Sequence, residues 1–395
     1  GAGGLAISFV SGDQLSKIYG QENAIGSILI GNLILWFFGM IFISMSRLHR
    51  ENAIVNIKEH LGKKSALFGA VCLILILVGW FLIQLKSANI LIGKTLQIDE
   101  SNPLDINLRI GALLGLSAAL LGIGGLRVIK WIFSISLFLI LGEIIYSLFH
   151  MDVPIQFNWS FTFLGIFSNI LVLLAGVINL PSFFKYARSK ADAYLGLTLW
   201  FLFIMFFEIT GVWLSKSNLF LFNSNILNTH SIFYTYFLVG FIVITVLANL
   251  ISNIFFSSAC WEILYKNFKG PKKFAILGLL YTSLYLFIQV AGPIKYIFNL
   301  ANYFVGALAG VLMMTYLGML IVQQKRHIIV QYVGVGAWAV GCFTAFFQEQ
   351  VYTNHPAETF WVTLCATGLF FLFSFFLYET VWSGRKILQR RFYSS

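Results

Sequence analysis

"AGVINLP", Ala175 to Pro181, stands near the end of a long apolar run and decides how that run folds. Pro181 has no amide hydrogen to donate within a helix, and Gly176 tolerates backbone angles that other residues avoid. Together they predict a helix that breaks part-way along its apolar run. The alternative is that both residues only reflect the higher frequency of Gly and Pro in membrane helices.

The composition of the whole chain is that of a membrane protein. Of its 395 residues, 59% are hydrophobic and only 10% are charged, whereas soluble domains carry about 25% charged residues. Apolar runs of about 18 or more residues recur along the chain, and in lipid such runs form helices because every backbone group needs an internal partner. We therefore expect an all-α integral membrane protein surrounded by the lipid bilayer.

The apolar runs predict about 12 transmembrane helices. We expect full spans at about 24–45, 66–92, 108–124, 128–149, 160–184, 193–214, 232–262, 273–291, 294–322, 328–347 and 359–382. The earlier stretch "GAGGLAISFVSG" is too short to cross a bilayer of roughly 30 Å. We interpret it as the second half of helix 1, with the first half absent from this chain.

The basic residues predict the orientation of these helices. The formal net charge is +11, but Lys and Arg lie in short clusters between alternate spans rather than along one amphipathic face, so a nucleic acid polymer is not an expected partner. Under the positive-inside rule the clusters mark cytoplasmic loops, and most acidic residues then fall outside. We expect a multi-pass protein of the plasma (inner) membrane with both termini in the cytoplasm. The basic segment at 47–64 is short enough to form an interfacial helix.

Two predicted breaks lie five helices apart. "GAGG", Gly1 to Gly4, opens helix 1, and "AGVINLP" interrupts helix 6. This spacing is typical of a five-plus-five inverted repeat, in which the broken helices hold substrate and ions near the membrane midplane. We expect a single transmembrane domain over 1–395. It would consist of a first repeat at 1–149, a second repeat at 160–322 and two further helices at 328–382.

Helix 3 carries an aromatic ring and an amide on one face. Trp80 and Gln84 are four residues apart, so they point the same way from a helix. A wide ring beside a group that both donates and accepts hydrogen bonds suits a flat heterocycle with amide-like edges. The alternative is that Trp80 packs between helices and that Gln84 bonds to a neighbouring helix.

Helix 8 carries a polar stripe at helical spacing. It consists of Thr245, Asn249, Ser252, Asn253 and Phe256. Unpaired amides are costly in hydrocarbon, so these side chains are candidates to bind a substrate or a sodium ion. The alternative is that they bond helix 8 to its neighbours.

Other polar residues within the spans are weaker candidates. Asn302 and Tyr303 in helix 10 could form a gate, although close helix packing explains the small residues beside them. Glu143 and Glu208 lie deep in helices 5 and 7, where ionisation is costly, and are candidate proton carriers. A structural role is equally open for each carboxylate.

Catalytic and metal-binding patterns are not visible in this sequence. The four cysteines lie singly within or beside apolar runs, and the histidines are scattered over loops and helix ends. Neither an HExxH motif nor a Walker A motif occurs. We expect neither an enzyme nor a bound cofactor.

Four motifs resemble those of a known family. They are "SILIGNLILWFFG" at 27–39, "GWFLIQ" at 79–84, "PSFFKYARSK" at 181–190 and "LANLISNIFFSSA" at 247–259. They are similar to the nucleobase:cation symporter-1 permeases, which include the cytosine and hydantoin permeases. The resemblance covers nearly the whole chain in helix order and loop polarity, and implies a LeuT-type fold with coupling to sodium or protons.

The resemblance also implies roles for individual residues. Trp80 would stack on the heterocycle, and Gln84 and Asn253 would bond its edge. Further candidate ligands are Asn249 and Asn179 for the substrate, and Ser252 with backbone carbonyls near Gly1 and Gly4 for a sodium ion. Ser257 and Ser258 offer an alternative register for the helix 8 ligands.

The chain departs from the family at helix 6. Ser182 stands where the family has an acidic residue, and Lys185 replaces its first Arg. The family usually places an aromatic ring at the break to cover the second face of the base, whereas Val177 to Asn179 supply none. This difference bears on the substrate more than on the fold.

These observations predict a monomeric, cation-coupled secondary transporter. It would import a small, planar, uncharged heterocycle such as a nucleobase by alternating access. One rival hypothesis is an amino-acid permease on the same fold, whose broken helices hold a carboxylate. The other is a receptor subunit that uses this fold to sense a small molecule.

Overall fold

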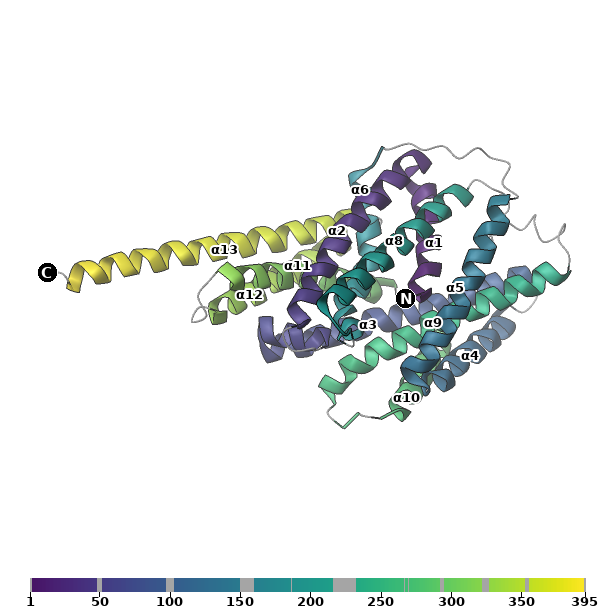
Figure 1. Cartoon of the computed structure of the whole chain (residues 1–395). Helices are drawn as coiled ribbons and strands as arrows, with labels where there is room; N and C mark the ends of the chain where they lie inside the picture. The colour runs from purple at the N-terminus through teal and green to yellow at the C-terminus, as the bar shows by residue number, and fades with distance from the viewer. Residues whose placement is uncertain are drawn as a thin grey trace.

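The structure is a bundle of α-helices (Figure 1). This computed structural model describes all residues except 1, 48–51, 97–102, 150–159, 186, 216–231, 266, 269, 292–294, 322–326, 352–354 and 394–395. Its elements are α1 (Ala2–Tyr19), α2 (Gln21–Arg47), α3 (Ala53–Thr95), α4 (Pro103–Gly122), α5 (Gly125–Phe149), α6 (Phe163–Asn179), α7 (Pro181–Phe184), α8 (Lys190–Leu214), α9 (Ile232–Leu264), α10 (Lys272–Ala291), α11 (Lys295–Ile321), α12 (His327–Val351) and α13 (Pro356–Tyr393).

Eight described segments are long and apolar enough to cross a membrane. They lie within α2, α3, the α6–α7 pair, α8, α9, α11, α12 and α13, and Arg109–Gly122 in α4 is a shorter apolar helix. Large apolar side chains are exposed along these helices, as expected where lipid replaces water. The prediction of a multi-pass membrane protein is confirmed, whereas the number of twelve spans stays a prediction.

The helix packing is symmetric between two halves of the chain. When α6 and α7 are counted together as the sixth helix, α8 to α11 become helices seven to ten. Then α1 packs on α8 as α6 packs on α2, and α5 packs on α9 as α11 packs on α3. Helices α3 and α9, and likewise α4 and α10, contact each other directly. Exchanging helices one to five with six to ten maps each of these contacts either onto another of them or onto itself. The repeat boundaries at 1–149 and 160–322 stay a prediction.

The sixth helix is interrupted at the predicted proline. Leu180 keeps helical angles (φ −51°, ψ −38°), and its N–H bonds to the carbonyl oxygen of Val177 at 3.2 Å. In a regular helix that carbonyl would accept from position 181, where proline has no N–H. The interruption is therefore a single residue between Asn179 and Pro181, and Gly176 lies inside α6.

The first helix is regular from its first described residue. Gly4 lies within α1, where carbonyl groups are occupied by N–H groups four residues further on. The expected free carbonyl at Gly4 is therefore not found. Gly1 lies outside the described residues.

A kink separates the predicted interfacial helix from the third span. Gly62 has φ 85° inside α3, an angle that glycine adopts without strain. The preceding turns bury Ile54 and Ile57 against the bundle. The basic segment thus contains the expected helix, which is joined to the span through Gly62.

Candidate functional site

A cavity of about 120 Å³ lies among α3, α6, α7, α8 and α9. Its lining consists of Leu77, Trp80, Gln84, Val172, Leu173, Ala175, Gly176, Leu180, Phe183, Trp200, Asn249, Ser252, Asn253 and Phe256. The sequence predicted Trp80, Gln84, Asn249, Ser252 and Asn253, and the structure brings all five to this one cavity. No charged side chain contributes to the described lining.

Two amides face each other across the cavity wall. Nδ2 of Asn253 on α9 donates to Oε1 of Gln84 on α3 at 3.0 Å, and both side chains are buried. Within the described structure this is the only hydrogen bond that either side-chain amide makes. The contact therefore leaves one donor group unpaired, the Nε2 amino group of Gln84 with its two N–H bonds, and one acceptor unpaired, Oδ1 of Asn253. Reversing both amides would also leave one donor and one acceptor, so the pattern does not depend on how they are oriented.

Trp80 forms an aromatic wall one turn before Gln84. Its ring meets the ring of Phe298 on α11 edge-on, with centroids 5.7 Å apart and planes at 86°. The neighbouring Gly79 permits this approach, because a Cβ atom there would lie 2.0 Å from Cδ2 of Phe298. In the motif "GWFLIQ", Gly79 thus allows the close packing, while Trp80 and Gln84 line the cavity.

The polar stripe on α9 divides between the cavity and its own helix. Asn249, Ser252 and Asn253 line the cavity. Oγ of Ser252 donates to the carbonyl of Ala248 at 2.7 Å, so its lone pairs remain for a ligand. Thr245 does not line the cavity and donates to carbonyls of its own helix, those of residues 241 and 242.

The alternative register on α9 points away from the cavity. Ser257 accepts a hydrogen bond from Tyr281 of α10 at 2.8 Å, and Ser258 donates to the carbonyl of Phe255 at 2.7 Å. Neither residue lines the cavity. The geometry therefore favours Asn249, Ser252 and Asn253 over this pair.

Three predicted site residues lie elsewhere. Nδ2 of Asn179 donates to the carbonyl of Ala175 in its own helix at 2.9 Å, and the side chain does not line the cavity. Asn302 and Tyr303 on α11 do not line it either. Tyr303 is fully buried.

The two carboxylate candidates also lie outside the cavity. Glu208 on α8 is fully buried between α2 and α6, where it contacts Asn32 and Asn169. The backbone of Glu143 belongs to α5, but its side chain lies outside the described part of the structure. Among the described residues no group of three or more His, Cys, Asp or Glu side chains is placed to hold a metal ion.

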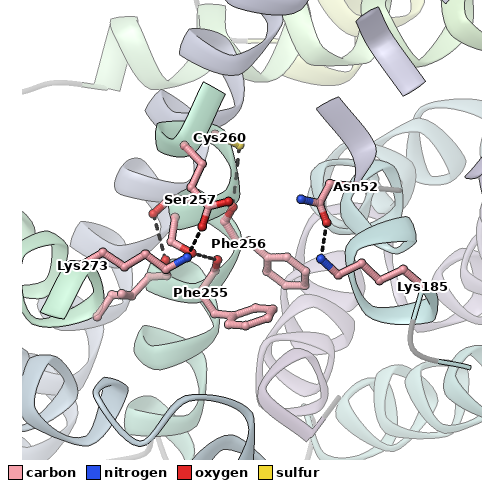
Figure 2. A network of polar contacts seen from close by, with 10 residues as sticks. Asn52, Lys185, Phe255, Phe256, Ser257, Cys260 and Lys273 are labelled. Carbon is pink, nitrogen blue, oxygen red and sulfur yellow. Dashed lines mark hydrogen bonds and ion pairs between the residues drawn. The ribbon is translucent and has the colours of Figure 1, made fainter. Parts of the chain in front are cut away.

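Aromatic rings of α7 and α9 meet beside the cavity. Phe183 of α7 meets Phe256 edge-on at 4.6 Å between ring centroids and stacks on Phe255 at 5.7 Å. Figure 2 shows Phe255 and Phe256 between Lys273 on one side and the pair of Lys185 and Asn52 on the other. Lys273 forms an ion pair with the carboxylate of Glu262. Phe183 and Phe256 also line the cavity.

Sequence reasoning missed two aromatic residues of the site, Trp200 and Phe183. Trp200 on α8, Phe183 and Phe256 all line the cavity, and only Phe256 had been noticed as part of a stripe. These residues place aromatic rings at the cavity, whereas Val177 to Asn179 at the interruption of the sixth helix contain none. Trp200 gave no signal because it is one aromatic residue within an apolar helix, without a polar neighbour at helical spacing.

Comparison with known proteins places the fold. No family model matches the chain, and no curated protein matches its sequence. Among solved structures it is similar to Mhp1, a nucleobase-cation-symport-1 family transporter, in a closed conformation with bromovinylhydantoin bound; the TM-score is 0.68 at 16% identity, over 94% of this chain and 90% of that one. The chain has the fold of Mhp1.

Two further structures extend this finding. Mhp1 in its inward-facing conformation matches with a TM-score of 0.65, at 16% identity and over 95% of this chain and 88% of that one. A Na⁺-coupled sialic acid symporter in a substrate-bound, outward-open state matches with a TM-score of 0.55, at 12% identity and over 95% and 96% of the two chains. These neighbours are transporters rather than enzymes, and they confirm the predicted LeuT-type fold. At these identities the match establishes the fold alone.

Proposed function

We propose that the chain is a cation-coupled secondary transporter that imports a small, planar, uncharged heterocycle by alternating access. A nucleobase such as cytosine or a purine, or a related hydantoin-like compound, fits best. The observation that carries this proposal is the meeting of Trp80, Gln84 and Asn253 at one buried cavity. The resemblance in sequence motifs and the likeness in fold to Mhp1, whose structure holds bromovinylhydantoin, support it.

The cavity offers what recognition of a base requires. An aromatic ring supplies stacking, worth about 1–3 kcal/mol per base. The amide pair presents one free donor and one free acceptor, which match the adjacent N–H and C=O groups on the edge of a nucleobase or hydantoin. We assign stacking to Trp80, edge recognition to Gln84 and Asn253, a further polar contact to Asn249, and a second aromatic wall to Trp200.

The described lining favours an uncharged substrate over an amino acid. It contains no Lys, Arg, Asp or Glu to pair with a carboxylate or an ammonium group. Transfer of an unpaired charge into such a site is costly. We therefore rank an amino-acid permease below a heterocycle transporter.

Alternating access fits the way the cavity is closed. Release toward the cytoplasm would require Phe183 of α7 to separate from Phe256 of α9. The short α7 follows directly after the interruption at Leu180, so it can move relative to α6 with little loss of backbone hydrogen bonding. Mhp1 has been seen in both closed and inward-facing conformations, which supports this proposal by analogy.

The remaining assignments extend the same proposal. The protein would function as a monomer in the plasma (inner) membrane with both termini in the cytoplasm. A sodium ion, if it is the coupling ion, would lie near Ser252, with carbonyl groups before the start of α1 at Gly1 as the other ligands. The clustering of Lys and Arg between alternate spans supports the proposed orientation, and the Na⁺-coupled structural neighbour supports the proposed sodium site.

A counterflow assay tests the function directly. The purified protein is reconstituted in liposomes preloaded with unlabelled cytosine, uracil, hypoxanthine or hydantoin, and exchange with the labelled compound outside is measured. We expect saturable exchange of at least one heterocycle by wild type and none by Trp80→Ala. Exchange of amino acids alone would show the rival permease, and tight heterocycle binding without exchange would show a receptor.

A further inference from the structure

A second polar site lies in the bundle, away from the substrate cavity. Glu208 of α8 is 0% exposed. Its Oε2 accepts hydrogen bonds from Nδ2 of Asn32 on α2, at 2.5 Å, and from Nδ2 of Asn169 on α6, at 3.2 Å. Three separate helices thus contribute one side chain each to a single carboxyl group.

The three side chains leave buried oxygen atoms without partners. Oε1 of Glu208, Oδ1 of Asn32 and Oδ1 of Asn169 are all fully enclosed, and none has a hydrogen bond in the described part of the chain. No cationic side chain contacts Glu208 there. Buried polar groups are nearly always satisfied, so these three oxygens indicate a missing donor or cation.

The helices that carry the site approach each other closely. A Cβ atom on Gly12 of α1 would lie 1.9 Å from the backbone oxygen of Glu208, and one on Gly31 of α2 would lie 3.2 Å from Cβ of Asn169. A proton needs no cavity, so it fits this close packing. A proton on Oε1 would supply a donor where acceptors are unpaired, and the two amide N–H groups stabilise the carboxylate once the proton leaves.

We propose that Glu208, Asn32 and Asn169 form a proton-binding site, and that a proton taken up there is the coupling ion for import. The coupling role rests on the proposed transport function, but proton binding itself does not. Helices α6 and α8 also line the substrate cavity, through Leu173 one turn after Asn169 and through Trp200. A change in the charge of Glu208 therefore acts on two helices that hold the substrate.

Other ionisable groups on the helices around the site are few. On α1, Asp13 follows Gly12, is buried, and forms an ion pair with Lys17 at 2.7 Å. Tyr19 of α1 bonds to Ser168 of α6. On α2, Glu22 is exposed. The side chain of Glu143, on α5, is not described. Asp13 is thus the other buried carboxyl group near Glu208 and provides the matched control.

Infrared difference spectroscopy tests proton binding without any substrate. The purified wild-type protein is titrated between about pH 5 and about pH 9, and the carbonyl band of protonated carboxylic acids is followed. We expect a band that disappears as the pH rises, is absent in Glu208→Gln, and is retained in Asp13→Asn. In Asn169→Leu the band should change position, because the amide that contacts the carboxyl group is gone.

Three results would overturn the proton site. They are a wild-type band that does not change over this pH range, a band that Glu208→Gln retains, and a band that only Asp13→Asn abolishes. The wild-type titration needs no variant, so the site remains testable even if Glu208→Gln does not fold.

An uptake assay in the same liposomes separates coupling from transport. For one coupled proton, a pH difference of about one unit supports up to about tenfold accumulation of cytosine, uracil, hypoxanthine or hydantoin. We expect Glu208→Gln to lose this accumulation but keep counterflow. Accumulation by Glu208→Gln at the wild-type level would refute the coupling role while leaving the transport function standing. Absence of counterflow by wild type would refute the transport function, and the infrared titration would still decide the proton site.

Discussion

Nδ2 of Asn253 donates to Oε1 of Gln84 at 3.0 Å, joining α9 to α3 at the wall of the cavity. These two helices occupy corresponding positions in the two halves of the symmetric packing. The bond pairs the amino group of Asn253 with the carbonyl oxygen of Gln84. The amino group of Gln84 and the carbonyl oxygen of Asn253 remain for a ligand. The same contact therefore stabilises the helix pair and prepares an edge-recognition site.

The aromatic wall predicts a large effect of Trp80→Ala on binding. Loss of stacking should weaken heterocycle binding by about 1–3 kcal/mol, roughly 5- to 150-fold in Kd. Trp80→Phe should keep part of the affinity. The matched control is Trp131→Ala, because Trp131 is 69% exposed on α5 and does not line the cavity. Equal affinities of Trp80→Ala and Trp131→Ala would rule out stacking by Trp80.

The amide pair predicts non-additive stability changes. Gln84→Leu or Asn253→Leu alone leaves a buried polar group unpaired and should lower the free energy of unfolding by about 1–3 kcal/mol. The double variant should lose less than the sum of the two, because neither partner is then stranded. Unfolding of the four proteins in one detergent measures this cycle. Additive losses would mean that the 3.0 Å contact contributes no coupling.

The contact between Gly79 and Phe298 predicts that Gly79→Ala disturbs the site. The added methyl group would overlap the Phe298 ring, and the displacement should cost about 1–3 kcal/mol and weaken heterocycle binding. Phe298→Leu in the same chain should recover part of both losses. Gly142→Ala on α5 is the control, since a Cβ atom there meets nothing within 4 Å. A Gly79→Ala protein with wild-type binding would show that Trp80 does not depend on this packing.

The aromatic closure predicts restricted access from the cytoplasm. A cysteine introduced by Ser252→Cys should react slowly with a membrane-impermeant thiol reagent applied to the cytoplasmic side, and faster when Phe183→Ala is added. The parent chain with its four native cysteines gives the background. Equal labelling rates with and without Phe183→Ala would contradict the assignment of Phe183 to the inner closure.

Helical periodicity explains why much of the site could be predicted from sequence. Trp80 and Gln84 are one turn apart, and Asn249, Ser252 and Asn253 follow one face of a helix, so each group had to point in one direction. Exposing an unpaired amide to lipid costs free energy, so these faces were expected to point into the helix bundle. Pro181 likewise fixed the interruption of the sixth helix through its missing N–H.

Other contacts could not be predicted, because local sequence does not determine what a side chain meets. The side-chain amide of Asn179 donates to the backbone carbonyl of Ala175, four residues earlier in the same helix. Any Asn in a helix can make this bond, so the sequence does not show whether its amide turns to a ligand instead. Trp200 lies among other apolar residues, and periodicity does not separate a cavity wall from a lipid face. The partners of Glu208 are 176 and 39 residues away, so only the folded packing brings Asn32 and Asn169 to it.

The central claim is that the cavity binds a planar heterocycle between Trp80 and the Gln84–Asn253 pair. The most direct test is the thermal stability of the purified protein against nucleobases, hydantoins, vitamins and amino acids, measured for wild type and Trp80→Ala in parallel. We predict that at least one heterocycle raises the melting temperature of wild type and that Trp80→Ala loses this shift. Stabilisation by amino acids alone, or an equal heterocycle shift in both proteins, would contradict the claim.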